Sequence, residues 1–150
     1  MRFLIWHVDS FRSTVTQRGR SPLVEEVPPE GRTTEVGEAL LVLASVERGD
    51  EGAPQTVAEG AAAEIDALAR QLKVGTIVLH SFAHLFAELA APATAVEVLD
   101  LLRERLQQRG YVVARTPFGW FNTLEIKAKG HPLSRVARTV RPDLPASGAY

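Results

Sequence analysis

The sequence predicts a single α/β domain in which two main helices pack on one mixed β-sheet that is closed in part into a barrel. Strand-like and helix-like segments alternate along the chain, and two segments show long apolar stripes at helical spacing. The chain has 150 residues, of which 45% are hydrophobic and 23% charged, so one domain can bury its own core. We assign residues 1–140 to this domain and residues 141–150, which contain prolines, to a linker or tail.

The N-terminal part is predicted to hold strands. Residues 2–8 are apolar enough for a buried first strand, and residues 10–17 alternate with β-branched side chains, so they could pair back on it as a hairpin. Residues 18–34 are rich in proline and glycine and are expected to form an irregular arm. Residues 36–47 then predict another strand.

Two helices are predicted from their stripes and their ends. Each is expected to begin with a capping box, at Thr56 and Glu59 in the first and at Thr94 and Glu97 in the second. The second helix is expected to end at Gly110, because glycine is favoured just beyond a helix. The stripes consist of Val57, Ala61, Ile65, Leu68 and Leu72 in the first helix and Val96, Leu99, Leu102 and Leu106 in the second.

The remaining segments predict further strands. Residues 76–80 form a buried strand between the helices, and residues 111–115 and 121–127 form two more after them. Residues 133–139 are too short to assign, and residues 83–90 would add one or two helical turns.

Missing motifs exclude several kinds of chemistry. Without cysteine the chain has no disulfide, thiolate zinc site or cysteine nucleophile, which suits a reducing compartment. It also lacks the phosphate-binding glycine loops and the G-x-S-x-G elbow of serine hydrolases. His80 and His84 have the spacing of a helical metal pair but no obvious third ligand, so we expect no metal and no cofactor. No signal peptide or membrane span is visible, and we expect a cytoplasmic protein.

Positive charge is concentrated towards the C-terminus. Between Arg103 and Arg141 there are nine Lys or Arg and two acids, a net of +7, although the formal net charge of the whole chain is −1. Such a segment can present a basic face to phosphate. Alternatively, its arginines are scattered over several solvated faces.

Three short segments are unusual for purely structural sequence, because each places polar or aromatic side chains at a strand end, where sheet proteins often build sites. They are Ser81-Phe82-Ala83-His84-Leu85, Pro117-Phe118-Gly119-Trp120-Phe121 and Lys129-Gly130-His131-Pro132-Leu133. Taken singly, each could instead plug a barrel end or shape a turn.

Together with His7-Val8-Asp9, Ser45-Val46-Glu47 and Glu88-Leu89-Ala90, these segments resemble the N-terminal editing domain of archaeal threonyl-tRNA synthetases, in the same order over about 140 residues. The resemblance implies the fold of the D-aminoacyl-tRNA deacylases, a homodimer, and tRNA as partner. It also implies hydrolysis of L-seryl-tRNA made in error on threonine tRNA, assisted by the 2′-hydroxyl of the terminal adenosine.

The resemblance also implies a site. His84 and Asn122 would be its catalytic side chains, and backbone groups near Val46, Ala83 and Phe118 would form the pocket wall and read the amino group. The other substrate-binding residues would be Gly119, Trp120 and Phe121. From the basic segment we assign tRNA binding to Arg115, Lys127, Lys129 and Arg135.

The chain departs from the family pattern at two places. Trp120-Phe121-Asn122 stands where the family has Tyr-Tyr-Lys, and Arg135 stands where it has a glutamate. Two other functions therefore stay open: removal of D-amino acids, and a tRNA-binding or dimerisation module that has lost catalysis. The domain could act in trans or with a synthetase catalytic chain or C-terminal domains. No class II synthetase motif is present, so we expect no aminoacylation from this chain.

Overall fold

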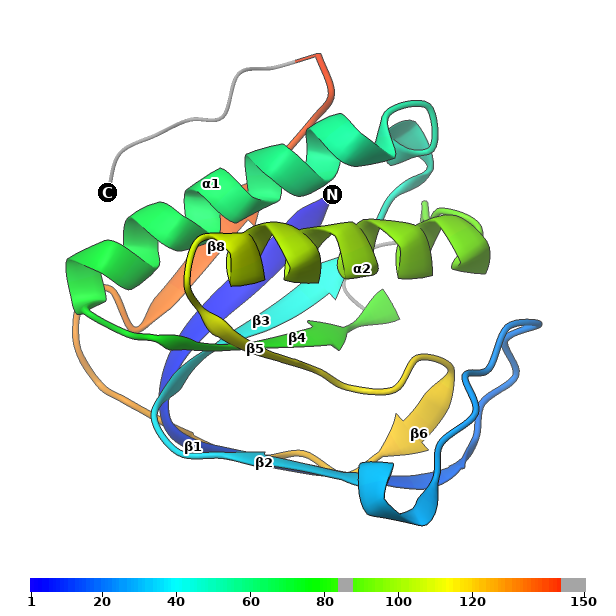
Figure 1. Ribbon diagram of the computed structural model, residues 1–150, viewed down its shortest axis with the longest axis horizontal. Coiled ribbons are helices and arrows are strands. Elements are labelled where there is room, and N and C mark those ends of the chain that lie inside the picture. The colour runs from blue at the N-terminus through cyan, green and yellow to red at the C-terminus, as the bar shows by residue number, and fades with distance from the viewer. Residues whose placement is uncertain (84–87, 144–150) are drawn as a thin grey trace.

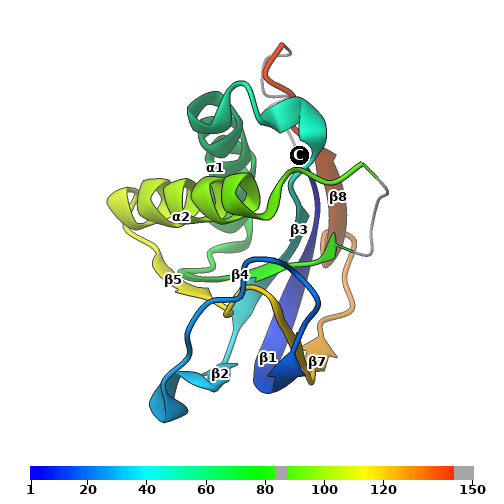
Figure 2. The same ribbon diagram turned by 90° about the vertical axis from the view of Figure 1, so that its right-hand side faces the viewer.

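Two helices cover one face of a curved β-sheet in the computed structural model, which describes residues 1–83 and 88–143 (Figures 1 and 2). The strands are β1 (Arg2–Arg18), β2 (Thr33–Val36), β3 (Ala39–Ser45), β4 (Thr76–Ser81), β5 (Val112–Arg115), β6 (Trp120–Asn122), β7 (Glu125–Ala128) and β8 (Arg135–Thr139). The helices are α1 (Pro54–Leu72) and α2 (Pro92–Gln108), and Pro29–Gly31 and Arg48–Asp50 form 3-10 turns. No helix in the described ranges is long and apolar enough to cross a membrane.

Strand β1 organises the sheet. Strands β3 and then β2 lie along one of its edges, and β8, β7 and β6 follow one another along the other edge, all of them antiparallel to β1. Strands β3, β4 and β5 run parallel to one another and extend the sheet away from β1. This arrangement confirms the predicted class, an α/β domain with one mixed and partly closed sheet and two main helices.

Both faces of the sheet are buried near β3, which explains its continuous apolar sequence. Leu40 and Val42 face the helices and belong to the main core with α1 and α2. Leu41 and Leu43 face the other way and pack with Val78 and Phe11 in a second, smaller cluster. The alternation of side chains along one strand thus serves two separate hydrophobic layers.

The hairpin expected at residues 10–17 is wrong, because these residues continue β1. Nothing between His7 and Ser10 can reverse the chain as a glycine or Asn-Gly turn would. Instead, the pairing register with β7 shifts between Val8 and Ser10, so that the second half of β1 takes new partners. The alternation in residues 10–17 therefore reflects pairing with β2, β6 and β7.

Other strand boundaries also differ from expectation. The segment 36–47 contains the end of β2, a bend at Gly37 and Glu38, and then β3. The segment 121–127 contains parts of two strands, β6 and β7. The unassigned residues 133–139 contain β8, whereas the predictions for residues 76–80 and 111–115 are confirmed by β4 and β5.

Both predicted capping boxes are wrong. Helices α1 and α2 begin at Pro54 and Pro92, with alanine as N-cap and no hydrogen bond from a capping side chain. Proline suits the first helical position because its φ is already helical and it has no N–H to satisfy. The C-terminal prediction for α2 is confirmed, since Arg109 is the C-cap and Gly110 follows with φ +97°.

The helical turns expected at residues 83–90 fall partly on residues 84–87, which lie outside the described residues. Leu89, which is described, forms an antiparallel bridge with Glu47 instead of a helical turn. Of the predicted tail, residues 144–150 also lie outside the described residues.

Candidate functional site

A pocket of about 500 Å³ lies at the C-terminal end of β4. Three segments line it: residues 19–21 after β1, residues 80–83 at the end of β4, and residues 117–122 with Leu124 around β6. The pocket brings together most of the predicted catalytic and substrate-binding residues, namely Ala83, Phe118, Gly119, Trp120, Phe121 and Asn122. The carboxyl ends of parallel strands are the usual place for sites in such sheets, and β4 is one of three parallel strands here.

The wall formed by residues 117–120 is held by Glu25, a residue that the sequence did not single out. The Glu25 carboxylate accepts hydrogen bonds from Arg115 Nη1 at 2.7 Å, from Arg115 Nη2 at 2.5 Å and from the Phe118 amide at 2.6 Å. Its backbone carbonyl accepts the Trp120 indole N–H at 2.8 Å, and its amide donates to the Phe118 carbonyl at 3.1 Å. Glu25 thus ties the residue 18–34 arm to the pocket wall.

Glycine is required where the same two segments touch. Gly119 has φ +90°, and a Cβ there would lie 2.6 Å from the Leu23 carbonyl oxygen and 2.8 Å from Val24 Cα. Its own carbonyl accepts the Gly19 amide at 2.7 Å. Any side chain would therefore clash with backbone as well as strain the left-handed conformation.

These contacts limit which backbone groups can meet a ligand. The Phe118 amide, one of the groups expected to read the substrate, already donates to Glu25, and its carbonyl already accepts one hydrogen bond. Val46, another expected wall residue, is 5% exposed and belongs to the helix-side core, and its carbonyl accepts the Ala90 amide. Val46 is therefore not among the described residues that line the pocket.

His80 is the most buried polar residue of the pocket lining, at 5% exposed. Its Nδ1 lies 2.7 Å from the Thr116 hydroxyl, and its ring lies near Phe11 and Phe82. Burial lowers the pKa of His80 to about 4, so the ring is neutral near pH 7. Within the described lining, the other polar side chains are Arg20, Ser21, Ser81 and Asn122, and no carboxylate is among them.

His84, the second predicted catalytic residue, lies outside the described residues. The proposed helical pair of His80 and His84 therefore has only one member in the described structure. Within residues 1–83 and 88–143, no group of three or more His, Asp or Glu side chains could hold a metal ion.

The basic residues predicted to bind tRNA are not gathered on one surface. The Arg115 side chain is 7% exposed and donates hydrogen bonds to Glu25 and, at 2.9 Å, to Asp100 Oδ1. The hydrogen bonds that it donates to Glu25 outweigh burial and raise the pKa of Arg115. Within the described sheet Arg115 lies on β5, which β4 and β3 separate from β1 and its partners β7 and β8. Arg115 does not line the pocket itself, and we regard it as a support of the pocket wall through Glu25.

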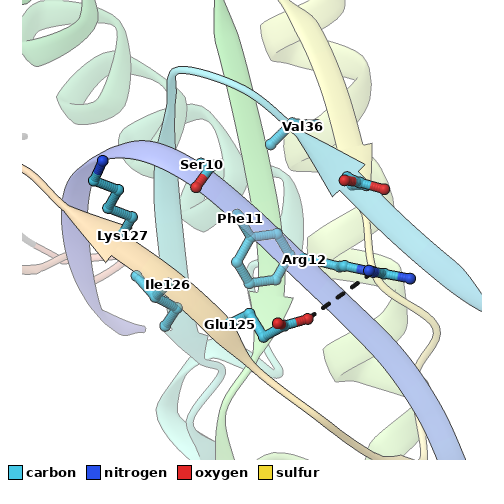
Figure 3. A pocket seen from close by; sticks show the side chains of 8 residues that line it. Ser10, Phe11, Arg12, Val36, Glu125, Ile126 and Lys127 are labelled. Atoms are coloured by element: carbon cyan, nitrogen blue, oxygen red, sulfur yellow. Dashed lines mark ion pairs between the residues drawn. The ribbon is translucent and has the colours of Figure 1, made fainter.

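The other three basic residues lie on or near β7 and β8. Lys127 lines a second pocket, of about 370 Å³, beside Ser10 and an ion pair between Arg12 and Glu125 (Figure 3). Lys129 Nζ lies 2.5 Å from Asp9 Oδ1, and hydrogen bonding to Asp9 raises the pKa of this lysine. The Arg135 guanidinium lies over the Trp6 ring, 5.7 Å from its centre.

The Lys129–Leu133 segment holds the first strand and does not line the large pocket. His131 Nε2 lies 2.8 Å from His7 Nδ1, and His7 Nε2 lies 3.2 Å from Glu38 Oε2. The Leu133 amide donates to His131 Nδ1 at 3.2 Å. His7 is 6% exposed, so the structure places it as a packed and hydrogen-bonded residue.

Known proteins resemble this chain over nearly its whole length. Threonine--tRNA ligases of Methanopyrus kandleri and Thermococcus gammatolerans are 43% and 40% identical to it over 143 and 144 residues, each match covering 95% of the chain. The chain spans only 22% and 23% of those two relatives. A solved structure titled c-Myc DNA Unwinding Element Binding Protein shares the fold, with a TM-score of 0.65, 14% identity and coverage of 93% of this chain and 99% of that one.

The family comparison agrees with the sequence motifs. The model of the archaea-specific editing domain of threonyl-tRNA synthetase matches residues 1–140. Since this match covers more than nine-tenths of the chain, the chain belongs to the archaea-specific editing domain family of threonyl-tRNA synthetase.

Proposed function

We propose that this domain is an aminoacyl-tRNA deacylase that removes L-serine attached in error to threonine tRNA. The observation that supports it most is the pocket of about 500 Å³, in a member of an editing-domain family, whose wall contains Ala83 and residues 118–122. Serine and threonine differ by one methyl group, which binding alone discriminates by only about 1–3 kcal/mol, so a second sieve is needed. A pocket that fits serine would exclude threonine by that methyl group.

The reaction needs a placed water and a stabilised oxyanion. The water oxygen attacks the ester carbonyl carbon, the bond to the ribose 3′ oxygen breaks, and a proton passes to that oxygen, with the neighbouring 2′-hydroxyl as relay. We assign orientation of the water to Asn122, whose amide can both donate and accept a hydrogen bond but supplies no charge. His84 would orient the substrate, as the family resemblance implies.

We assign the contact with the tRNA backbone to Lys127, Lys129 and Arg135, and we leave Arg115 out because its side chain is only 7% exposed. Replacing Lys127 and Arg135 together with alanine should weaken tRNA binding and flatten its salt dependence. Arg70→Ala, which changes an exposed arginine on α1, is the matched control. We further propose a homodimer that acts in the cytoplasm, alone or with the rest of a threonyl-tRNA synthetase.

Deacylation assays with L-seryl-, L-threonyl- and D-aminoacyl-tRNA test the proposal. We expect the seryl ester to be hydrolysed and the threonyl ester to be spared, and turnover should be lost when the terminal 2′-hydroxyl is replaced by hydrogen. Equal rates on the seryl and threonyl esters contradict the serine specificity. Hydrolysis of D-aminoacyl esters instead would identify a chiral proofreader, and binding without turnover would identify a module that has lost catalysis.

A further inference from the structure

His80 is a buried polar side chain of the pocket that the proposed reaction does not yet use. It comes from the C-terminal end of β4, and its side chain points to the face of the sheet away from the helices, where it meets Phe11 and Phe82. It is 5% exposed and lines the pocket. A polar group so deep in an apolar wall is costly unless its hydrogen-bonding atoms find partners.

Thr116 is the described hydrogen-bond partner of the His80 ring. The Thr116 hydroxyl lies 2.7 Å from His80 Nδ1 and 3.5 Å from the Leu79 carbonyl oxygen, which also accepts the Thr116 amide at 3.0 Å. When the hydroxyl donates to Leu79, it accepts the Nδ1–H of His80. The other ring nitrogen, Nε2, then carries a lone pair.

Nε2 is free to meet a ligand. Within the described part of the chain it makes no hydrogen bond, and it is not among the fully enclosed polar atoms, so it has access to the space of the pocket. Burial lowers the pKa of His80 to about 4, which keeps this lone pair unprotonated near neutral pH. In the tautomer with the proton on Nδ1, the pocket lining therefore contains a buried hydrogen-bond acceptor.

The chemistry of the lining points to the group that this acceptor would meet. The described lining residues include a cation, Arg20, and no carboxylate, so a charged ammonium would find no counter-ion. An aminoacyl ester that enters with a neutral amine needs an acceptor for its N–H, and an imidazole lone pair is well suited. The ester and hydroxyl oxygens of the substrate can instead accept from Asn122 or from water.

We propose that His80 is a positioning residue whose Nε2 accepts a hydrogen bond from the α-amino group of the aminoacyl ester. The inference rests on the proposed function and deepens it, because it names the side chain that recognises the amine. In this proposal the Thr116 hydroxyl accepts the Nδ1–H of His80, so that it holds the ring and leaves Nε2 unprotonated.

The test uses two stable analogues of the tRNA terminus: adenosine carrying L-serine through a 3′-amide, and the same compound without the α-amino group. Their dissociation constants are measured by calorimetry for the wild-type domain, for His80→Phe and for Thr116→Val. Removing the amine should weaken binding to the wild type about 10-fold, the value of one hydrogen bond. His80→Phe should bind both analogues equally, and Thr116→Val should show an intermediate effect.

The outcomes separate the two proposals. If neither analogue binds the wild type, the proposed function fails and this inference fails with it. If the seryl analogue binds and removing its amine costs His80→Phe as much as the wild type, the role of His80 alone is overturned. A measurement on the wild type guards against misfolded variants: the Nε2 nitrogen resonance should be that of an unprotonated nitrogen and should shift with the seryl analogue but not with its deaminated form.

Discussion

Replacing Glu25 should loosen the pocket wall and destabilise the domain. The Glu25→Ala variant leaves the Phe118 amide without its acceptor and leaves Arg115, 7% exposed, with Asp100 as its remaining carboxylate. Breaking a buried ion pair costs about 3–5 kcal/mol of stability. Because Glu25 is 27% exposed and Arg115 keeps one carboxylate partner, we expect the free energy of unfolding of Glu25→Ala to fall by about 2–3 kcal/mol. Glu25→Gln keeps an acceptor and loses the charge, and we expect about half of that loss.

Urea unfolding at pH 7 measures the free energies of unfolding of these variants relative to the wild type. Glu26→Ala is the matched control. Glu26 is the next residue, its side chain is 90% exposed, and it lies 3.6 Å from Arg18, so its removal should cost less than about 0.5 kcal/mol. If Glu25→Ala unfolds as readily as Glu26→Ala does, Glu25 does not hold the wall. Affinity for the seryl analogue should fall with Glu25→Ala and stay unchanged with Glu26→Ala.

The stability contributed by Glu25 should depend on pH in a defined direction. Burial raises the pKa of this carboxyl, but hydrogen bonds from Arg115 and the Phe118 amide outweigh burial and hold it below its usual value of 4.5. A carboxylate with a lowered pKa stabilises the fold above its unfolded pKa, and the stability is lost as the pH falls through the folded pKa. Glu25→Gln should therefore lose stability less steeply than the wild type as the pH is lowered from about 5 to 3.

Three further predictions concern single residues. Gly119→Ala should destabilise the domain by more than about 1 kcal/mol in thermal unfolding, because its Cβ would clash with the Leu23 carbonyl oxygen and the residue has φ +90°. Wild-type stability of this variant would contradict the clash. Burial and a hydrogen bond to Asp66 raise the pKa of Tyr111 to about 12, so its phenol should ionise near that pH in an ultraviolet titration, and Tyr111→Phe should remove this step. Since burial lowers the pKa of His80, the unfolded state binds its proton first, so stability should fall as the pH drops below about 6.5, and less so in His80→Phe.

Much of the fold could be predicted because the signals were local. One short apolar run between the two amphipathic helices predicted β4, another after the second helix predicted β5, and Gly110 marked the end of α2. The helix starts were misplaced because the capping-box pattern competes with a proline two residues earlier, and the prolines Pro54 and Pro92 decide the position. The continuity of β1 could not be predicted, since it depends on strands more than 100 residues away, such as β7 and β8.

In the candidate site, too, features with a local sequence pattern could be predicted, and features that depend on distant contacts could not. Residues 117–122 stand out as an aromatic run around a glycine, and the structure places them around the pocket. Glu25 lies in an arm with no periodicity, and its partner Arg115 is 90 residues further along the chain, so no local pattern reveals the pair. The same pair explains why Arg115, which its charge assigned to the tRNA, is buried against Glu25.

The pairing of β1 also sets the order in which the domain can be completed during synthesis. Residues 2–6 of β1 pair with β8, and the Met1 carbonyl accepts the amide of Val140 at 2.8 Å. Strand β1 is therefore synthesised long before its partner β8, and this edge of β1 stays open until residues 135–140 have emerged. Such long-range pairing slows folding and leaves an unpaired edge exposed meanwhile. A nascent chain stopped before β8 would expose that edge to other chains, so aggregation of truncated forms is the expected failure of this fold.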